Sequence, residues 1–189
     1  KTTNTAVDYD TDVNGQLLHI AAAGSLTPAV GDDTPISTNL IGGTGELYTF
    51  TETKFTAGAA EDTKLTDIIY SVTRGAGGAP TSTVSNISLW DGSTQIGTTL
   101  AGLSASTGAA KFTNLEWVIP AGTTKSLVVK GMVPIVDGTN ASSGASFAFH
   151  ASTSDYQCGE TGICWKGVTS GTVGTSSSGY AGNAMYTYK

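Results

Sequence analysis

The sequence predicts an all-β chain folded as an antiparallel β-sandwich, and three observations lead to this prediction. Helical periodicity is nearly absent along the 189 residues. Strand-length segments alternate polar and apolar residues, which is the pattern of strands with one buried face. Gly, Pro, Asn and Asp separate these segments at a spacing of about 8–12 residues, as in sandwiches. Strands that bury only one face also exclude a doubly wound parallel sheet.

The first part of the chain contains three expected strands. Residues 16–23 are a mostly apolar run and form the first of them. Residues 24–45 contain several Pro and Gly residues, which interrupt regular structure, so we expect a loop there. Residues 46–56 alternate cleanly, and residues 63–73 are rich in aliphatic side chains, so both are expected to be strands.

A hairpin is expected near the middle of the chain. Residues 84–99 divide into two strands, 84–90 and 94–99, around the pair Asp91-Gly92. An Asp-Gly pair between two such segments is a strong signal for a tight turn. The two strands are therefore expected to lie side by side in one sheet.

Residues 109–119 are expected to form one continuous strand. Its alternation assigns Phe112 and Val118 to one face, and Leu115 and Trp117 to the other.

The remaining strands are expected at 125–133, 145–153 and 184–188. A stretch at 167–183 that is rich in Gly, Ser and Thr is expected to be a linker before the last of them. The aromatic residues expected to mark the core are Tyr48, Phe50, Tyr70, Trp90, Phe112, Trp117, Phe147 and Phe149.

The composition narrows the classes of partner. Charged residues make up 13% of the chain, which is about half the usual share of a soluble domain. The formal net charge is −6 and the isoelectric point is about 4.6. Such a chain lacks the basic surface that nucleic-acid phosphates require, so no nucleic-acid partner is expected. No apolar run approaches the roughly 18 residues of a membrane-spanning helix, so no such segment is expected.

Two cysteines, Cys158 and Cys164, stand six positions apart in a segment with two glycines. Glycine allows so short a loop to close, and we expect a structural disulfide worth roughly 2 kcal/mol. Free thiols and a redox pair are the alternatives, although redox pairs usually have C-x-x-C spacing. A disulfide favours an extracellular or cell-surface location.

An acidic segment near the N-terminus matches the first half of a calcium-binding loop. Asp8, Asp10, Asp12 and Asn14 supply side-chain oxygens at alternate positions, and Gly15 stands where such loops turn sharply. Calcium prefers six to eight oxygen ligands, so these residues are candidate ligands of a calcium ion. The glutamate that closes such a loop is missing, and the alternative is a solvated acidic turn. Any remaining ligands would come from elsewhere.

Two other acidic pairs bear on the calcium shell. Glu61-Asp62 is a plausible second cluster of ligands, while Asp32-Asp33 is expected to be a solvated loop. The chain is thus divided into an N-terminal extended segment with the acidic loop, at 1–15, and a single β-sandwich domain, at 16–189. The domain carries the disulfide loop at 158–164.

Three motifs between residues 55 and 133 occur in a recognisable order. Glu61-Asp62 precedes a strand, Trp90-Asp91-Gly92 ends the first strand of a hairpin, and Ile119-Pro120-Ala121-Gly122-Thr123 precedes a further strand. In this order they resemble the immunoglobulin-like β-sandwich repeats of bacterial surface-layer and pilus-like filament proteins. Residues 182–189 resemble the junction between consecutive repeats. The resemblance implies an immunoglobulin-like Greek-key topology and an extracellular structural role.

No signature of catalysis stands out. The sequence has neither a G-x-S-x-G nor an H-E-x-x-H motif. His19 and His150 each lie among apolar residues, as packed strand histidines do. We therefore expect a protein that is not an enzyme.

The expected function is that of a structural subunit that assembles with copies of itself into a filament or a surface layer. Residues 1–5 have no local partner strand, and residues 184–189 are expected to form an edge strand; exposed strands pair with other chains. The alternative is an adhesin or a carbohydrate-binding module that contacts cell-surface glycans. Trp165, which follows the disulfide loop, is expected to be exposed for such a ligand.

Overall fold

An all-β architecture is present in the computed structural model, which describes residues 23–75, 81–139, 141–151, 158, 162–176 and 180–188. Strands β1 to β14 and one 3-10 turn, η1 (Thr81–Thr83), are the regular elements of these residues. The prediction of an all-β chain is confirmed. None of the described residues belongs to a helix that is long and apolar enough to cross a membrane.

One sheet has five strands, and its neighbouring strands are antiparallel. In spatial order they are β1 (Leu26–Val30), β3 (Tyr48–Ala57), β9 (Thr124–Met132), β5 (Ser85–Asp91) and β6 (Thr94–Gly102). β5 and β6 form the expected hairpin, in which Gly92 turns with a φ of 58°. Glycine adopts this left-handed conformation without steric cost, which is why the Asp-Gly signal located the turn correctly.

The other sheet has nine strands and is mixed. Its main path runs through β12 (Val173–Ser176), β11 (Ile163–Gly167), β4 (Thr63–Arg74), β10 (Ser146–Ala151), β14 (Met185–Tyr188) and β2 (Thr38–Ile41). β13 (Tyr180–Ala181) pairs with β10, while β7 (Ala109–Phe112) and β8 (Trp117–Ile119) pair with β4. β14 and β2 are parallel, so the prediction of a purely antiparallel sandwich is wrong at this pair. No hairpin joins these two strands, and antiparallel pairing is therefore not imposed on them.

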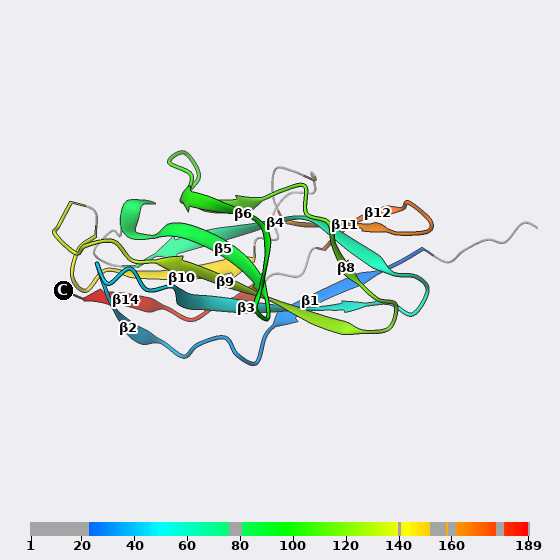
Figure 1. Cartoon of the computed structure of the whole chain (residues 1–189), viewed down its shortest axis with the longest axis horizontal. Coiled ribbons are helices and arrows are strands. Elements are labelled where there is room, and N and C mark those ends of the chain that lie inside the picture. The colour runs from blue at the N-terminus through cyan, green and yellow to red at the C-terminus, as the bar shows by residue number, and fades with distance from the viewer. Residues whose placement is uncertain are drawn as a thin grey trace, which may run out of the picture.

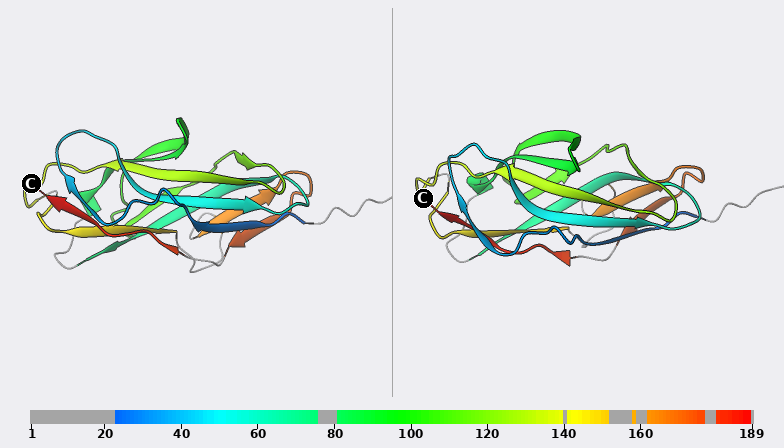
Figure 2. Two further views of the ribbon diagram at one scale, coloured as in Figure 1. Left: turned by 90° about the horizontal axis from the view of Figure 1, so that it is seen from below. Right: turned by 60° about the horizontal axis from the view of Figure 1, so that its bottom comes forward.

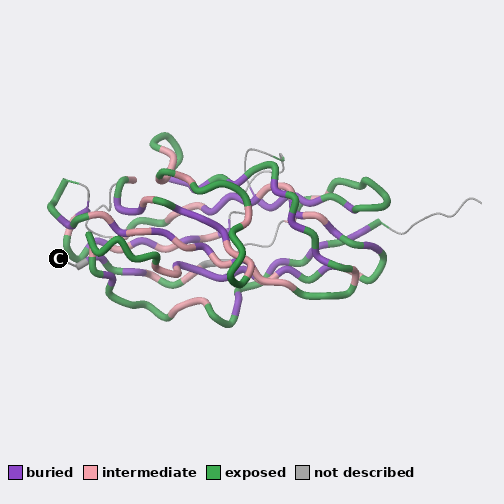
Figure 3. The backbone as a smooth tube through the Cα atoms, viewed as in Figure 1, coloured by how far each residue is buried: buried purple, intermediate pink, exposed green. Residues whose placement is uncertain are grey.

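The two sheets face each other across one hydrophobic core (Figures 1 and 2). Phe50 of β3 packs against Phe147 and Phe149 of β10, with ring centroids 5.3 and 5.0 Å apart. A hydrogen bond of 2.8 Å joins the hydroxyls of Thr53 and Tyr70 across the same interface. Buried segments run along the facing strands (Figure 3). Six of the expected core markers are buried, whereas Tyr48 and Trp90 are half-buried.

Residues 24–45 are not the loop that the sequence predicts, because β1 and β2 lie within them. Leu26 and Pro28 are the buried positions of β1, which among the described strands is an edge strand paired only with β3. An edge strand tolerates proline because the missing N–H need not join a ladder. The side chain of Leu40 is buried in the core and packs β2 against it. The expected strand at 16–23 lies outside the described residues except for Ala23.

The expected strand at 109–119 is broken into β7 and β8. Asn114 adopts a φ of 55° between them, which turns the backbone and shifts the phase of the alternation. As a result Phe112, Leu115 and Trp117 are all buried, while Val118 is exposed. The predicted assignment of Phe112 and Val118 to one face is therefore wrong.

The C-terminal strand was expected at a sheet edge, and this expectation is also wrong. β14 lies between β10 and β2, because β2 covers the side of β14 that the sequence left open. The expected linker at 167–183 contains β12 and β13. β12 reads Val-Gly-Thr-Ser and β13 has only two residues, so both lack the apolar alternation by which the longer strands were recognised.

The Phe50 contacts give a direct test of the core. We expect Phe50→Ala to lower the free energy of unfolding by about 3–5 kcal/mol, since it removes the ring between the sheets and leaves a cavity. Phe50→Leu, which keeps most of the apolar volume, should cost clearly less. Urea denaturation followed by fluorescence measures both variants, and equal stability of Phe50→Ala and the wild type would contradict this packing.

Candidate functional site

At one end of the elongated body, a buried carboxylate accepts hydrogen bonds from several segments of the chain. Glu61 lies in the turn between β3 and β4, and its side chain is 6% exposed. Its Oε1 accepts hydrogen bonds from the Gly24 N–H at 2.8 Å and from the Ser170 hydroxyl at 2.5 Å. Its Oε2 accepts the backbone N–H groups of Thr169 and Ser170, both at 2.8 Å. We call this arrangement the Glu61 clasp.

The clasp favours the ionised form of Glu61. The hydroxyl and the backbone N–H of Ser170 are the largest causes that lower its pKa, and the N–H groups of Thr169 and Gly24 act in the same direction. Burial opposes them, yet the pKa falls from 4.5 to about 2. Hydrogen-bond donors alone therefore stabilise this carboxylate, since a group that accepts several N–H bonds is easier to ionise.

Glycines allow the backbone to approach Glu61 this closely. A Cβ at Gly167 would lie 2.3 Å from Glu61 Oε1, and a Cβ at Gly24 would lie 3.1 Å from the same atom. The clasp thus joins three segments: the start of the described chain, the β3–β4 turn and the β11–β12 hairpin. It fixes Gly24 close to the start of the described chain.

Both members of the Glu61-Asp62 pair are engaged with backbone donors. Asp62 Oδ1 accepts the Ala121 N–H at 2.8 Å. The pair therefore faces N–H and O–H groups, which is not the setting expected for cation ligands. Among the described residues no group of three or more His, Cys, Asp or Glu side chains could hold a metal. The predicted calcium ligands Asp8, Asp10, Asp12 and Asn14 lie outside the described residues.

A second buried carboxylate, Glu52, was missed by the sequence reasoning. Its side chain accepts the Asp33 N–H at 2.6 Å, and a Cβ at Gly31 would lie 2.2 Å from its Cδ. Asp32, expected to be solvated, is exposed and pairs with Lys54. Gly31 and Asp33 contact Glu52 in the fold but lie about twenty residues before it in the sequence. No local pattern in the sequence indicates such contacts, so they could not be predicted.

The two cysteines are joined by a disulfide between Cys158 and Cys164, with Cα atoms 5.5 Å apart. The expectation that Trp165 is exposed is wrong, because this side chain is 7% exposed and belongs to the core. Its ring packs directly on Gly174 of β12, where a Cβ would lie 2.1 Å from Cζ2. β12 therefore covers the ring, and Trp165 offers no surface on which a sugar could stack.

The side chains of Trp117 and Trp90 also make contacts within the sheets. Trp117 donates its indole N–H to Asp91 at 2.9 Å, and the Lys125 ammonium lies 4.7 Å from the Trp117 ring. Burial acts to raise the pKa of Asp91, but hydrogen bonds from Lys125 and Trp117 outweigh it and lower that pKa. Trp90 is half-buried under Lys130, at 5.1 Å. His150 lies in β10, where burial lowers its pKa; His19 is outside the described residues.

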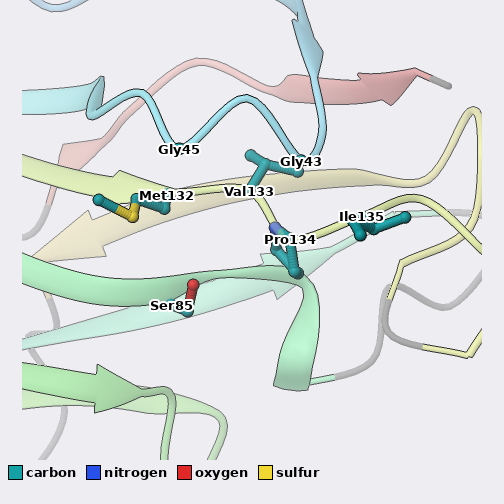
Figure 4. Close-up of a pocket in the computed structure, with 7 residues that line it drawn as sticks. All are labelled: Gly43, Gly45, Ser85, Met132, Val133, Pro134 and Ile135. Atoms are coloured by element: carbon teal, nitrogen blue, oxygen red, sulfur yellow. The ribbon is translucent and has the colours of Figure 1, made fainter.

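An apolar pocket lies beside the loop after β2 and the end of β9, toward the opposite end of the body (Figure 1), and Figure 4 shows the residues that line it. Its volume is about 410 Å³. The residues that line it are Gly43, Gly45, Ser85, Met132, Val133, Pro134 and Ile135. None of these residues carries a charge, so the pocket suits aliphatic groups. The lining has no side chain that could act as a general acid or a general base. Ser85 is its one hydroxyl, and the lining holds no basic residue that could activate this serine as a nucleophile.

Close backbone contacts shape this pocket. The N–H of Gly43 donates to the Val133 carbonyl at 3.0 Å. A Cβ at Gly42 would lie 2.4 Å from the Pro134 carbonyl oxygen, and a Cβ at Gly43 would lie 2.9 Å from Ile135 Cγ1. Gly42 and Gly43, at the end of the predicted loop at 24–45, therefore have a packing role, because they let the β2–β3 loop lie directly against the end of β9.

Large apolar side chains are exposed around the pocket. Ile135 is 64% exposed, Ile41 at the end of β2 is 59% exposed, and Leu47 before β3 is 44% exposed. The Tyr48 hydroxyl donates to the Ile41 carbonyl at 3.0 Å, which ties these segments together. We call the pocket with Ile41, Leu47 and Ile135 the apolar pole. Exposed apolar groups gathered in this way are characteristic of interaction surfaces.

A smaller hollow of about 280 Å³ lies between β4, β8 and β11. Lys64 and Glu116 form an ion pair of 2.7 Å on its wall, and the Glu116 side chain is 78% exposed. Exposed ion pairs contribute little to stability. The hollow therefore combines ordinary surface charges without a buried polar group that would point to a ligand.

No protein-family model matches the chain, and no curated protein matches it in sequence. Among solved structures, the chain is similar to a family 123 glycoside hydrolase from Clostridium perfringens, with 10% identity and a TM-score of 0.34. The match covers 87% of this chain and spans 28% of that hydrolase chain. A likeness at this level supports no argument about activity.

The Glu61 clasp predicts an acid-sensitive stability. Above pH 4.5, the ordinary pKa of this carboxyl, Glu61 is ionised in both the folded and the unfolded chain, and its full stabilisation is present. As the pH falls from 4.5 to about 2, the unfolded chain binds a proton that the folded chain does not, so this stabilisation is lost. The free energy of unfolding, measured by urea denaturation across this range, should decrease accordingly.

Glu61→Gln isolates this contribution from that of the other acids. The variant should be less stable than the wild type at pH 7, because an amide opposes the clasp donors, and its stability should fall less between pH 4.5 and 2. Glu116→Gln, at an exposed acid, is the matched control and should follow the wild-type curve. Parallel curves for Glu61→Gln and the wild type would contradict the role of the clasp.

Proposed function

We propose that the chain is an extracellular structural subunit, without catalytic activity, that assembles with copies of itself into a filament or a surface layer. The observation that carries this proposal is the placement of the chain ends. The described chain starts at the end held by the Glu61 clasp, and β14 ends at the opposite end of the long axis (Figures 1 and 2). A head-to-tail contact between unlike ends does not close on itself and generates a linear polymer.

The surface chemistry supports the same proposal. The apolar pole exposes Ile41, Leu47 and Ile135 at the end away from the clasp. A contact there would remove apolar area from water, which is the main favourable term in association. The chain contains only 13% charged residues, so few charges would have to be desolvated between subunits.

The N-terminal residues extend this proposal to strand exchange and calcium. The clasp holds Gly24 close to the start of the described chain, which gives the segment that precedes it a fixed anchor. In the proposed assembly they pair with a neighbouring subunit, and calcium bound by Asp8, Asp10, Asp12 and Asn14 would stiffen them. An immunoglobulin-like Greek-key arrangement of the two sheets is part of the same proposal.

The alternative of an adhesin or carbohydrate-binding module has less support. Its main candidate, Trp165, lies under β12, and Trp90 is half-buried beneath Lys130. A sugar site of this kind needs an aromatic face open to solvent. The alternative requires no self-association, which separates it from the structural role.

Electron microscopy of the purified chain tests the proposal. We expect ordered filaments or sheets in calcium, and their loss on chelation because the candidate ligands would no longer hold the N-terminal segment in place. Asp10→Asn combined with Asp12→Asn should reproduce the effect of chelation in the presence of calcium. Polymers that ignore chelation would keep the structural role without calcium, whereas monomers under every condition would contradict the structural role itself.

A further inference from the structure

Contacts within the chain hold the pocket of the apolar pole open in the absence of a ligand. The Gly43 N–H holds the β2–β3 loop to the Val133 carbonyl, and Tyr48 holds the end of β2. These contacts leave the hollow of about 410 Å³ open beside Met132 and Ile135 (Figure 4). A preformed, uncharged pocket binds an apolar group at low ordering cost. The ligand should therefore be an apolar segment.

The chain itself supplies such a segment outside the described residues. Residues 16–22 read Gln-Leu-Leu-His-Ile-Ala-Ala, with Leu17, Leu18 and Ile20 as its large apolar side chains. They directly precede Ala23 and Gly24, which the Glu61 clasp holds at the other end of the body. Because the segment lies next to the anchored Gly24, its side chains can reach only sites within a short distance of that residue.

That reach excludes the pocket of the same molecule. Leu17 lies six residues before Ala23, and a chain of this length spans at most about 20 Å. The pocket lies beside the start of β3, where Tyr48 pairs with Gly131, whereas Gly58 binds the Ser25 carbonyl at the end of β3. β3 has 10 residues and is therefore about 30 Å long. The segment cannot cover this distance.

We infer that residues 16–22 of one copy dock in the pocket formed by Gly43, Met132, Val133, Pro134 and Ile135 of a second copy. The contact is heterologous, because the clasp end of one subunit meets the apolar pole of the next. This inference rests on the proposed self-assembly and deepens it by naming the donor segment and the acceptor pocket. Leu17, Leu18 and Ile20 provide the apolar groups, and Ile135 forms the exposed rim that closes over them.

Cysteine cross-linking between two full-length variants tests the contact. A preparation of Leu18→Cys is mixed with one of Ile135→Cys under mild oxidation, and a mixed disulfide dimer is expected on a non-reducing gel. Val173→Cys is the matched control for Ile135→Cys: Val173 is 61% exposed but lies on β12, at the clasp end. Equal cross-linking of Leu18→Cys to both positions, or to neither, would overturn the inference.

A charge in the pocket gives an independent measurement. Ile135→Asp should raise the concentration needed for assembly by about tenfold or more, because docking would bury an unpaired carboxylate. Val30→Asp should assemble as the wild type does, because Val30 is 41% exposed and pairs with Thr53 in the middle of β3, at neither end of the body. Thermal unfolding verifies that both variants are folded. A peptide of residues 14–23 should inhibit assembly of the wild type, whereas the same peptide with Leu17→Asp and Leu18→Asp should not.

The outcomes separate this inference from the proposed function. If the wild type forms polymers but Ile135→Asp assembles equally well and the cross-link is absent, the docking inference is overturned and self-assembly stands. If the wild type forms no polymer yet the specific cross-link appears, docking stands and the filament or layer is excluded. Binding of a small apolar ligand that the peptide cannot displace would also overturn the inference.

Discussion

One buried carboxylate, Glu61, accepts backbone N–H groups and a hydroxyl and so fixes the start of the described chain. Glu61 joins Gly24 to Thr169 and Ser170, residues 108 and 109 positions further along the chain than itself. Its charge is stabilised by N–H and O–H donors in a site where water is largely excluded, and an unpaired carboxylate there would be costly. The clasp consequently fixes Gly24 at the start of the described chain, and the docking that we propose depends on this anchor.

At both ends of the body, glycines allow other atoms to approach the backbone closely, but the groups that approach differ. At the clasp, Gly24 and Gly167 admit a carboxylate and its donors; at the apolar pole, Gly42 and Gly43 admit the carbonyl of Pro134 and the side chain of Ile135. At the first end the Glu61 carboxylate is held by hydrogen bonds, while at the second end Ile41, Leu47 and Ile135 are exposed to water. Such unlike ends are what a head-to-tail contact between copies requires.

Sequence reasoning succeeded for the longer strands. β3, β4, β9 and β10 and the β5–β6 hairpin lie close to their predicted positions. The buried side chains of β9 and β10 repeat with a period of two, and β3 and β4 remain recognisable although bulges interrupt their pairing. It failed at the edges: β1 contains Pro28, and the phase of 109–119 changes at Asn114. Glu61 was noticed as an acid but assigned to a cation, and Trp165 was placed at the surface although β12 covers it.

Local sequence was thus sufficient for the all-β class, the central strands and the phenylalanines of the core, since each depends on neighbours within a few residues. The partners of Glu61, the burial of Trp165, the parallel β14–β2 pair and the pocket at Met132–Ile135 were decided only by tertiary structure. The physical reason is common to all four. Each depends on which backbone segments, distant in sequence, come within hydrogen-bond or van der Waals distance, and residue spacing along the chain does not encode that distance.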